Sequence, residues 1–210
     1  MFRDRADAAL QLAERLREFR GCHALILAIP RGGVPMGKVL ADQLEGELDV
    51  VLVRKIPAPA HAEYAIGAID EGGHRYLSPD AERSFGNVYV EKAAAGQQAL
   101  LEKRRDLYSR VRKPADPLGR TVIIVDDGSA TGSTMEAALM VTHLRQPSML
   151  VAALGAAPPG VIEKLQSVAD RVVCIEISAE FFAVSQFYEQ FPQISDDEVM
   201  KLLKPRQAAP

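Results

Sequence analysis

Short apolar runs with few polar interruptions alternate along this chain with stretches of helical periodicity. The runs span residues 24–29 (ALILAI), 50–53, 120–125 (RTVIIV), 149–154 and 171–177. A run that is apolar at successive positions is typical of a strand covered on both faces by helices, as in a parallel sheet. The alternation therefore predicts an α/β fold with a doubly wound parallel sheet.

Helices are expected between these runs, at residues 4–19, 34–44, 91–111, 133–144 and 161–168. In the first of them, Ala9, Leu12 and Leu16 lie on one face, with arginine and glutamate opposite. A short closing helix is expected near the C-terminus, because Ser195 and Glu198 have the spacing of a capping box.

Composition indicates one ordinary globular domain. The 210 residues are 48% hydrophobic and 25% charged, which suffices for a single full core over residues 1–210. Lys plus Arg number 25 and Asp plus Glu 28, and this net charge of −3 argues against nucleic acid as a partner.

The first ten residues carry four charges, and no apolar run approaches the roughly 18 residues of a membrane span, so we expect a cytoplasmic protein without a membrane partner. Cys22 and Cys174 lie far apart, which indicates neither a disulfide nor a metal cluster.

Residues 54–90 depart from the alternation of strands and helices. Proline and glycine punctuate short apolar stretches throughout this segment. A long excursion in a compact domain is usually functional or disordered. We expect a small ribbon and a mobile loop here.

The loop after residues 120–125 combines acidic and anion-binding features. Asp126 and Asp127 come first, and adjacent carboxylates need hydroxyl donors, a divalent cation or a developing positive charge to offset them. Small and hydroxyl residues then lead into a helix, whose free N–H groups favour a phosphate. Each feature alone is most often a turn or a helix cap, but their order after a buried strand favours a sugar phosphate site. The chain has no GK followed by Ser or Thr, which argues against a Walker-type nucleoside triphosphatase.

Three motifs carry a resemblance to a known family. The segment VIIVDDGSATGSTM, residues 122–135, resembles the phosphoribosyl pyrophosphate (PRPP) signature of the type I phosphoribosyltransferases. Residues 30–37, PRGGVPMG, follow the first strand, where that family has its pyrophosphate loop and often a cis peptide bond. Arg54 and Lys55 follow the second strand, where the family places basic residues. With the stretch EYAIGA, the pattern is most similar to a small group of predicted phosphoribosyltransferases.

The resemblance implies an enzyme that uses Mg²⁺ to transfer the 5-phosphoribosyl group of PRPP to a nitrogenous base with release of pyrophosphate. Asp126 and Asp127 would bind the ribose hydroxyls, with Mg²⁺ reached through PRPP or water. The residues implied to hold the 5′-phosphate are Gly128, Ser129, Ala130, Thr131, Gly132, Ser133 and Thr134. Those implied to hold the pyrophosphate are Arg31, Gly32, Gly33, Arg54 and Lys55, of which Arg31 and Lys55 also count as catalytic. The excursion 54–90 would be a lid that excludes water.

The acceptor base is less constrained. Ala130 stands where the 6-oxopurine members carry an aspartate, so the loop implies no preference for hypoxanthine or guanine. Glu63, beside Tyr64 in a pattern similar to the mobile loop of the adenine members, is the candidate general acid or base; the alternative is a solvated glutamate. A hood of residues 178–204 is expected over the base. The aromatic cluster of residues 181–191, which also contains Val184 and Phe191, could stack on the base, with simple packing onto the sheet as the alternative. Its candidate base-binding residues are Phe181, Phe182, Phe187 and Tyr188.

The same pocket would also serve a second class of function, that of a non-catalytic PRPP-binding regulatory protein. A nucleotide-binding module of Rossmann type would need a GxGxxG motif, which the chain lacks. The family's habit further implies a homodimer.

Overall fold

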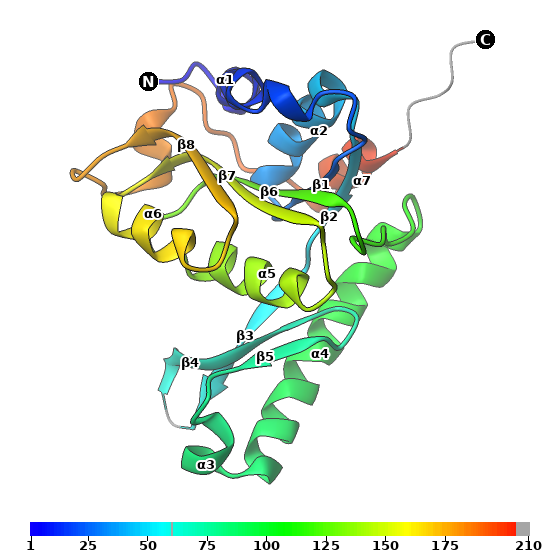
Figure 1. The fold of residues 1–210 in the computed structure, drawn as a ribbon, viewed down its shortest axis with the longest axis vertical. Helices are drawn as coiled ribbons and strands as arrows, with labels where there is room; N and C mark the ends of the chain where they lie inside the picture. The colour runs from blue at the N-terminus through cyan, green and yellow to red at the C-terminus, as the bar shows by residue number, and fades with distance from the viewer. Residues whose placement is uncertain (60, 205–210) are drawn as a thin grey trace.

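The computed structural model describes residues 1–59 and 61–204, except for the side chains of residues 61–64. Its largest element is a five-stranded sheet in which every neighbouring pair of strands is parallel (Figure 1). In spatial order the strands are β2 (Glu47–Val50), β1 (Leu25–Ala28), β6 (Thr121–Gly128), β7 (Met149–Ala157) and β8 (Arg171–Ile177). The predicted α/β fold with a parallel sheet is confirmed.

Helices cover both faces of this sheet (Figure 1). One face carries α1 (Arg5–Arg15) and α2 (Gly33–Leu44), and the other carries α5 (Ser133–His143) and α6 (Pro159–Gln166). Successive residues of a strand point to opposite faces. In β1, Ile26 and Ala28 join the core under α1 and α2, whereas Leu25 and Leu27 join the core against α5. This burial on both sides explains why the strands appear in the sequence as continuous apolar runs.

The prediction of a strand at residues 50–53 was wrong. The second parallel strand runs from Glu47 to Val50. Asp49 of this strand is only 1% exposed. From the sequence, a charged residue here is expected in a solvated loop and not in a buried strand. The carboxylate can be buried because Oδ1 pairs with Arg105 Nη1 at 3.1 Å and Oδ2 accepts the Ala115 amide at 2.8 Å. The apolar residues that follow Val50 connect this strand to the next sheet.

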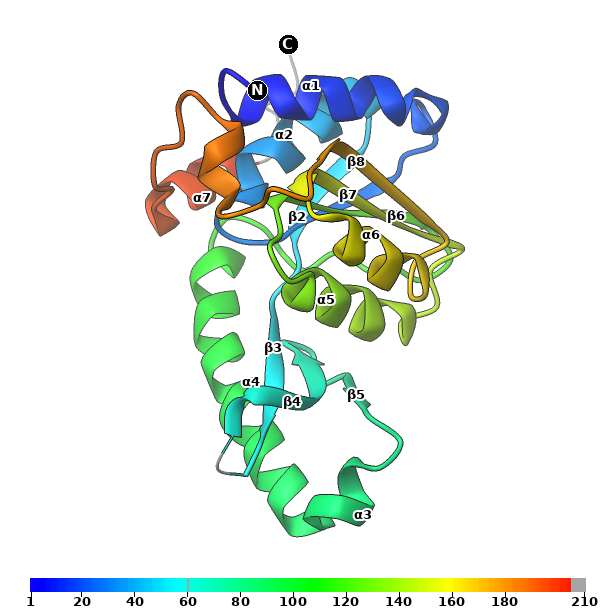
Figure 2. The ribbon, with the colours of Figure 1, turned by 90° about the vertical axis from the view of Figure 1, so that its left-hand side faces the viewer.

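The excursion of residues 54–90 forms regular structure. Together with the long helix in which it ends, the excursion makes a lobe of residues 53–109, which lies beside α5 (Figure 2). The lobe contains an antiparallel sheet in the order β3 (Val53–Ala58), β4 (His61–Asp70) and β5 (Arg75–Leu77), then α3 (Ala81–Phe85) and the long α4 (Asn87–Ser109). A ribbon of strands is therefore present in this segment, and its motion as a lid stays a prediction.

A buried arginine joins the lobe to the parallel sheet. Arg105 of α4 is 7% exposed and contacts both Asp49 of β2 and Glu71, which follows β4. It also donates to the carbonyl oxygen of Val50 at 3.0 Å, and Glu71 accepts the amide of Leu52 at 3.2 Å. Burial raises the pKa of Glu71, and the Arg105 guanidinium opposes this increase. The short connection between β2 and β3 is thereby held on both sides.

The hood, residues 178–204, contains a short 3-10 helix, Val184–Phe187, and the closing helix α7 (Asp196–Leu203). The predicted capping box is present: Ser195 Oγ accepts the Glu198 amide at 3.2 Å, and Glu198 Oε2 accepts the Ser195 amide at 2.8 Å. The hood also contacts the start of the chain, because the Phe2 amide donates to the Phe187 carbonyl oxygen at 2.7 Å. The hood therefore packs on the face of the sheet that carries α1 and α2, beside the first residues of the chain.

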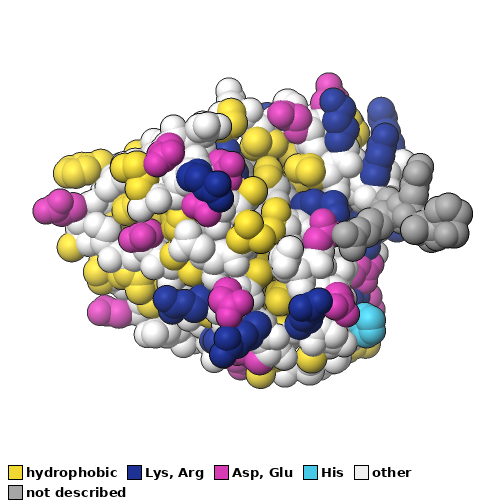
Figure 3. Space-filling view, turned by 90° about the horizontal axis from the view of Figure 1, so that it is seen from above, with side chains coloured by type: hydrophobic (Ala, Val, Ile, Leu, Met, Phe, Trp, Pro, Cys, Tyr) yellow, Lys and Arg dark blue, Asp and Glu magenta, His cyan; other side chains and the backbone are white. Residues whose placement is uncertain are grey.

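Two surface properties bear on partners. Within residues 1–59 and 61–204, none of the helices is both long enough and apolar enough to cross a membrane. On the face above α1 and α2, basic and acidic side chains lie interspersed (Figure 3). Their fields largely cancel beyond the screening length, which is about 8 Å at physiological ionic strength.

Replacing Arg105 by methionine should lower the free energy of unfolding by about 3 to 5 kcal/mol, because the Asp49 and Glu71 carboxylates would stay buried without a counter-charge. Urea unfolding measures this, with Lys103→Met at an exposed position of the same helix as control. Adding Asp49→Asn and Glu71→Gln to Arg105→Met should recover part of the loss. An Arg105→Met protein as stable as the wild type would contradict this account.

Candidate active site

Neighbouring strands at the middle of the parallel sheet send the chain to opposite faces. From β1 the chain enters α2 on one face, and from β6 it enters α5 on the other (Figures 1 and 2). β1 and β6 pair directly, and the Ile29 amide extends their ladder by donating to Val125 O at 3.0 Å. The carboxyl ends of such a pair leave a crevice in which α/β proteins bind ligands. The two loops singled out in the sequence, residues 30–33 and 126–134, both lie at this crevice.

The loop from β1 to α2 closely approaches the end of β6. Its peptide bond between Pro30 and Arg31 is cis, as the resemblance implies. A β-carbon on Gly32 would lie 2.0 Å from Asp127 Oδ2, and one on Gly33 would lie 2.5 Å from the carbonyl oxygen of Val125. Any larger residue would force the two loops apart, so these glycines serve the close approach of the loops.

The acidic pair, Asp126 and Asp127, ends β6 in two different surroundings. Asp126 is half-buried, and its Oδ1 accepts the Asp127 amide at 2.9 Å. Asp127 is 8% exposed, and its Oδ2 pairs with Arg5 Nε at 2.8 Å. Arg5 belongs to α1 and was not among the predicted site residues. One carboxylate of the pair is therefore committed to a protein partner, and the other has more contact with the crevice.

Burial is the main cause of a raised pKa at both members of the acidic pair. The pKa of Asp126 lies well above its usual range, because repulsion from Asp127 adds to the effect of burial. The Arg5 guanidinium opposes the increase at Asp127. A ligand that brings hydroxyl donors or positive charge would stabilise the ionised pair.

The loop from β6 to α5 is shaped by its own hydroxyl groups. Ser129 Oγ accepts the Gly132 amide at 2.9 Å, and Gly132 has a φ of +70°, in the left-handed region that favours glycine. α5 begins at Ser133, so its N-cap is a glycine with no side chain to cap the first turn. Thr131 and Thr134 are exposed at this end of the helix. Amides and hydroxyls gathered at a helix N-terminus suit a phosphate group.

The hood closes one side of the crevice. Gly128 packs so closely against it that a β-carbon there would lie 2.7 Å from Val184 Cγ1, whereas Ala130 is exposed. The crevice has a volume of about 520 Å³ and includes residues of both loops. Apart from the two loops and Ile29, the crevice is lined by a wall that consists of Arg5, Val184, Phe191, Pro192, Gln193 and Ile194.

The predicted basic residues lie in two adjoining hollows. Arg31 lines the crevice, and its Nη1 lies 4.0 Å from Asp196 Oδ2 in the hood. Arg54 and Lys55 of β3 line a second hollow of about 430 Å³, and Thr134 lines both. Arg54 Nε donates to a side chain of α4, Gln97, at 2.6 Å. The phosphate-type loop therefore has predicted basic residues on either side.

The four aromatic residues predicted to bind a base are not among the described residues that line the crevice. Tyr188 is 6% exposed, and its hydroxyl donates to the carbonyl oxygen of Asp127 at 2.6 Å. Phe187 packs against Phe181, with ring centroids 5.1 Å apart, and Phe182 is 89% exposed. Three other residues of the hood, Val184, Phe191 and Ile194, form the apolar part of the wall instead.

Glu63, the predicted general acid or base, belongs to β4. Its side chain lies outside the described part of the chain, so its role stays a prediction.

The sequence contains a signal that could have identified Arg5. Arg5 precedes Ala8, Ala9 and Leu12 by three, four and seven positions, and all three are fully buried. This spacing places the arginine on the apolar face of α1. A charge on that face needs a buried partner of opposite sign. The wall residues 192–194, by contrast, have no periodicity that could have identified them.

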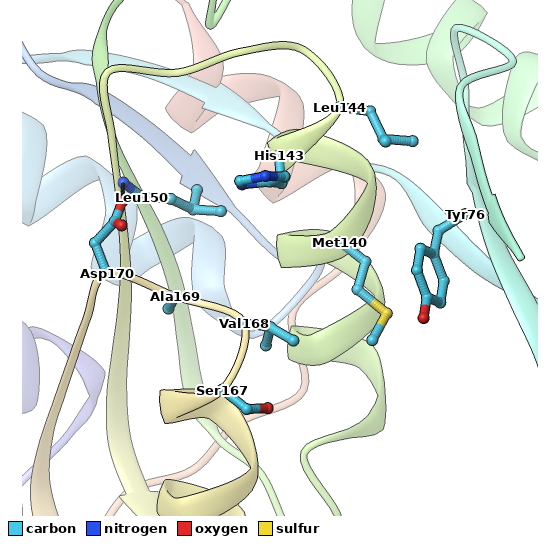
Figure 4. Close-up of a pocket in the computed structure, with 9 residues that line it drawn as sticks. All are labelled: Tyr76, Met140, His143, Leu144, Leu150, Ser167, Val168, Ala169 and Asp170. Atoms are coloured by element: carbon cyan, nitrogen blue, oxygen red, sulfur yellow. Dashed lines mark hydrogen bonds between the residues drawn. The ribbon is translucent and has the colours of Figure 1, made fainter. Parts of the chain in front are cut away.

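Another hollow, of about 420 Å³, lies at the C-terminal end of α5 (Figure 4). Met140, His143 and Leu144 line it at this end of the helix, together with Tyr76 of β5. Leu150, at the amino end of β7, also lines it. The hollow therefore lies at the amino ends of the parallel strands, away from the two loops at their carboxyl ends. It includes none of the predicted site residues.

Known proteins resemble this chain over most of its length. Residues 4–191 match the family model described as a phosphoribosyl transferase domain. The chain is 40% identical over 205 residues to a protein of Mycobacterium tuberculosis whose name assigns it provisionally to the phosphoribosyl transferases. That match covers 97% of this chain and 46% of the relative, so the chain spans about half the length of the curated relatives it matches. The crystal structure of TT1426 from Thermus thermophilus is similar at a TM-score of 0.92, with 43% identity over 97% of each chain.

The substitution Gly32→Ala should lower the free energy of unfolding by about 1 to 3 kcal/mol, because its β-carbon would push the Asp127 carboxylate away from Arg5. Gly96→Ala in α4 is the matched control, since a β-carbon there meets nothing within 4 Å. That control should instead stabilise the protein by about 0.5 to 1 kcal/mol. Urea unfolding of both variants checks the expectation, which equal effects at the two glycines would contradict.

Asp126→Asn should raise the melting temperature at neutral pH. Because the folded protein raises the pKa of Asp126, the ionised carboxylate destabilises the fold at neutral pH, and this cost disappears as the pH falls toward the unfolded pKa. Asparagine keeps an oxygen for the Asp127 amide and removes the charge. We expect a gain of about 2 to 4 °C at pH 8 that shrinks toward pH 4, measured by calorimetry. A gain that grows as the pH falls would have the wrong sign.

Proposed function

Because the chain belongs to the phosphoribosyl transferase family, we propose that it transfers the 5-phosphoribosyl group of PRPP to a nitrogenous base with release of pyrophosphate. One observation carries the proposal: the acidic pair, the N-terminus of α5 and the Arg31 loop converge on one crevice at the carboxyl ends of β1 and β6. That crevice offers hydroxyl acceptors, a phosphate site and positive charge, which are the three things PRPP requires.

The pentose and its 5′-phosphate would lie along the loop from β6 to α5. Asp126 has the more accessible carboxylate of the acidic pair and would accept hydrogen bonds from the ribose hydroxyls. The phosphate would take the first-turn amides of α5 and the hydroxyls of Thr131 and Thr134, which are exposed there. The 5′-phosphate would then lie at the junction of the two adjoining hollows, since Thr134 lines both.

The leaving pyrophosphate would lie toward the β1 loop. Its charge grows as the bond to the anomeric carbon breaks, and Arg31 in the first hollow and Arg54 and Lys55 in the second would face it. Arg5 also lines the first hollow, but its charge is paired with Asp127. A well-placed electrostatic contact of this kind contributes about 3 to 4 kcal/mol to transition-state stabilisation. Gly32 and Gly33 let the loop that carries Arg31 pack directly on the end of β6. The Gly33 amide is already bonded to the carbonyl oxygen of Ile29 at 3.0 Å.

Mg²⁺ fits this site only in company with the substrate. Within the described residues, no group of three or more His, Cys, Asp or Glu side chains could hold a metal ion. Asp127 Oδ2 is paired with Arg5, so Asp126 is the carboxylate with room for a cation or its water. When bound with PRPP, the ion would neutralise part of the pyrophosphate charge.

The acceptor would lie against the apolar wall of the hood formed by Val184, Phe191 and Ile194. The four aromatic residues predicted from the sequence do not line this crevice, and their role in base binding stays a prediction. Glu63 remains the proposed general acid or base. Cytoplasmic location, a homodimer and the absence of nucleic acid partners also remain predictions.

Pyrophosphate release from PRPP and Mg²⁺, measured across a panel of purines, pyrimidines and other heterocycles, tests the function. We expect turnover with at least one acceptor, and a loss of at least about 10-fold in kcat/KM for Asp126→Asn. Asp106→Asn, at an exposed position of α4, is the matched control and should retain activity.

Undiminished turnover in Asp126→Asn would contradict the ribose assignment. Tight binding of PRPP without pyrophosphate release from any acceptor would instead support the alternative of a PRPP-binding regulatory protein. An absence of PRPP binding would contradict both.

A further inference from the structure

We propose that Arg5 is a positioning residue that couples the hood to the acidic pair. Its contacts fix the position of Phe191 and Pro192 in the wall relative to the carboxylate of Asp127. The inference rests on the proposed function, because it concerns how the same crevice is prepared for PRPP. It assigns a role to α1, which contributes none of the residues implied by the family resemblance.

Three contacts of Arg5 carry this inference. Its Nε pairs with Asp127 Oδ2 at 2.8 Å, and its Nη1 donates to the carbonyl oxygen of Pro192 at 2.8 Å. The guanidinium carbon also lies 3.8 Å from the centroid of the Phe191 ring, within the range of a cation–π contact. A planar guanidinium can make all three contacts at once, which a lysine ammonium cannot. Each partner is a residue that lines the crevice.

Burial makes the geometry of Arg5 strict. The residue is 7% exposed and Asp127 is 8% exposed, so neither charge can turn to water if the pair is broken. A buried pair of this kind is a weak source of stability, but removing one partner leaves the other charge uncompensated. The pair therefore fixes where the Asp127 carboxylate points more than it stabilises the fold.

The hood contacts Asp127 by a second route. The Tyr188 hydroxyl donates to the main-chain oxygen of Asp127 at 2.6 Å, and the Tyr188 ring lies 4.9 Å from the ring of Phe191. Arg5 and Tyr188 thus bind the side chain and the main chain of one residue, and both pack on Phe191. A displacement of residues 191–192 would disturb the acidic pair through both contacts.

The two carboxylates of the acidic pair therefore have different roles. Asp127 is held by Arg5 and sets the shape of the crevice, and Asp126 is left to meet the pentose. Loss of Arg5 should therefore weaken PRPP binding through Asp127, without Arg5 itself having to touch the sugar.

A double-mutant cycle tests this coupling. The binding of PRPP with Mg²⁺ is measured by calorimetry for the wild type, Arg5→Met, Asp127→Asn and the double variant. We expect Arg5→Met to weaken binding at least about 10-fold, but to have less than about a 3-fold effect in the Asp127→Asn background, because the residue acts through Asp127. Arg5→Lys, which keeps the charge, should recover part of the affinity and serves if Arg5→Met folds poorly. Arg15→Met, at an exposed position of α1, is the matched control.

A second measurement needs no substrate. The amides of Glu189 and Gln190 donate to the carbonyl oxygens of Phe2 and Arg3, and their hydrogen exchange reports how firmly the hood is docked. Arg5→Met and Asp127→Asn should each accelerate this exchange at least about 10-fold relative to the amides of β7, and Arg15→Met should not.

The two measurements separate the inference from the proposed function. Additive effects in the binding cycle, or an Arg5→Met protein that binds PRPP like the wild type, would overturn the role of Arg5. If the wild type binds no PRPP, the proposed function fails, and exchange still decides the coupling. Acceleration in Arg5→Met without acceleration in Asp127→Asn would then refute it.

Discussion

The direct pairing of β1 with β6 is the constraint on which the crevice depends. Their parallel register runs from Leu25 opposite Val122 to Ala28 opposite Val125, and the Ile29 amide continues it. Because the two strands end side by side and their chains then leave for opposite faces, their loops must meet at the crevice. Gly32 completes the arrangement by letting one loop pack directly on the carboxylate of the other. Sheet register therefore decides which chemistry is brought together.

Two buried arginines hold the lobe and the hood against the parallel sheet. Arg105 connects the lobe to β2, and Arg5 connects the hood to the end of β6. In each case the partner is a carboxylate on a strand of the parallel sheet, so the peripheral part takes its position from that sheet. Pairs of this kind add little net stability, since desolvation offsets the attraction between the charges. Their effect is to select one placement of the lobe and one of the hood.

The contrast between predictable and unpredictable parts follows the range of the interactions. Strands such as β6 and β7 could be predicted because burial on both faces produces a continuous apolar run, and the acidic and glycine-rich loops could be found because they directly follow those runs. β2 was misplaced because its buried Asp49 is neutralised by a residue 56 positions away. Arg5 was missed for the same reason, since its partner lies 122 positions away. A charge whose partner is distant in sequence carries no local sign of that partner. The spacing can place Arg5 on the apolar face of α1, but only the fold shows that Asp127 neutralises it.

Under the proposed function, the two halves of the site rest on different kinds of interaction. The half that would bind PRPP is set by main-chain features: the register of β1 and β6, the glycines of one loop and the start of α5. The half that would meet the acceptor belongs to the hood, whose apolar side chains in the crevice are Val184, Phe191 and Ile194. Side-chain contacts on a surface segment can be rebuilt with other residues without moving a strand. If the chain acts as proposed, the choice of acceptor can therefore change while the half for PRPP stays the same, and the loop from Asp126 to Thr134 would specify the donor but not the base.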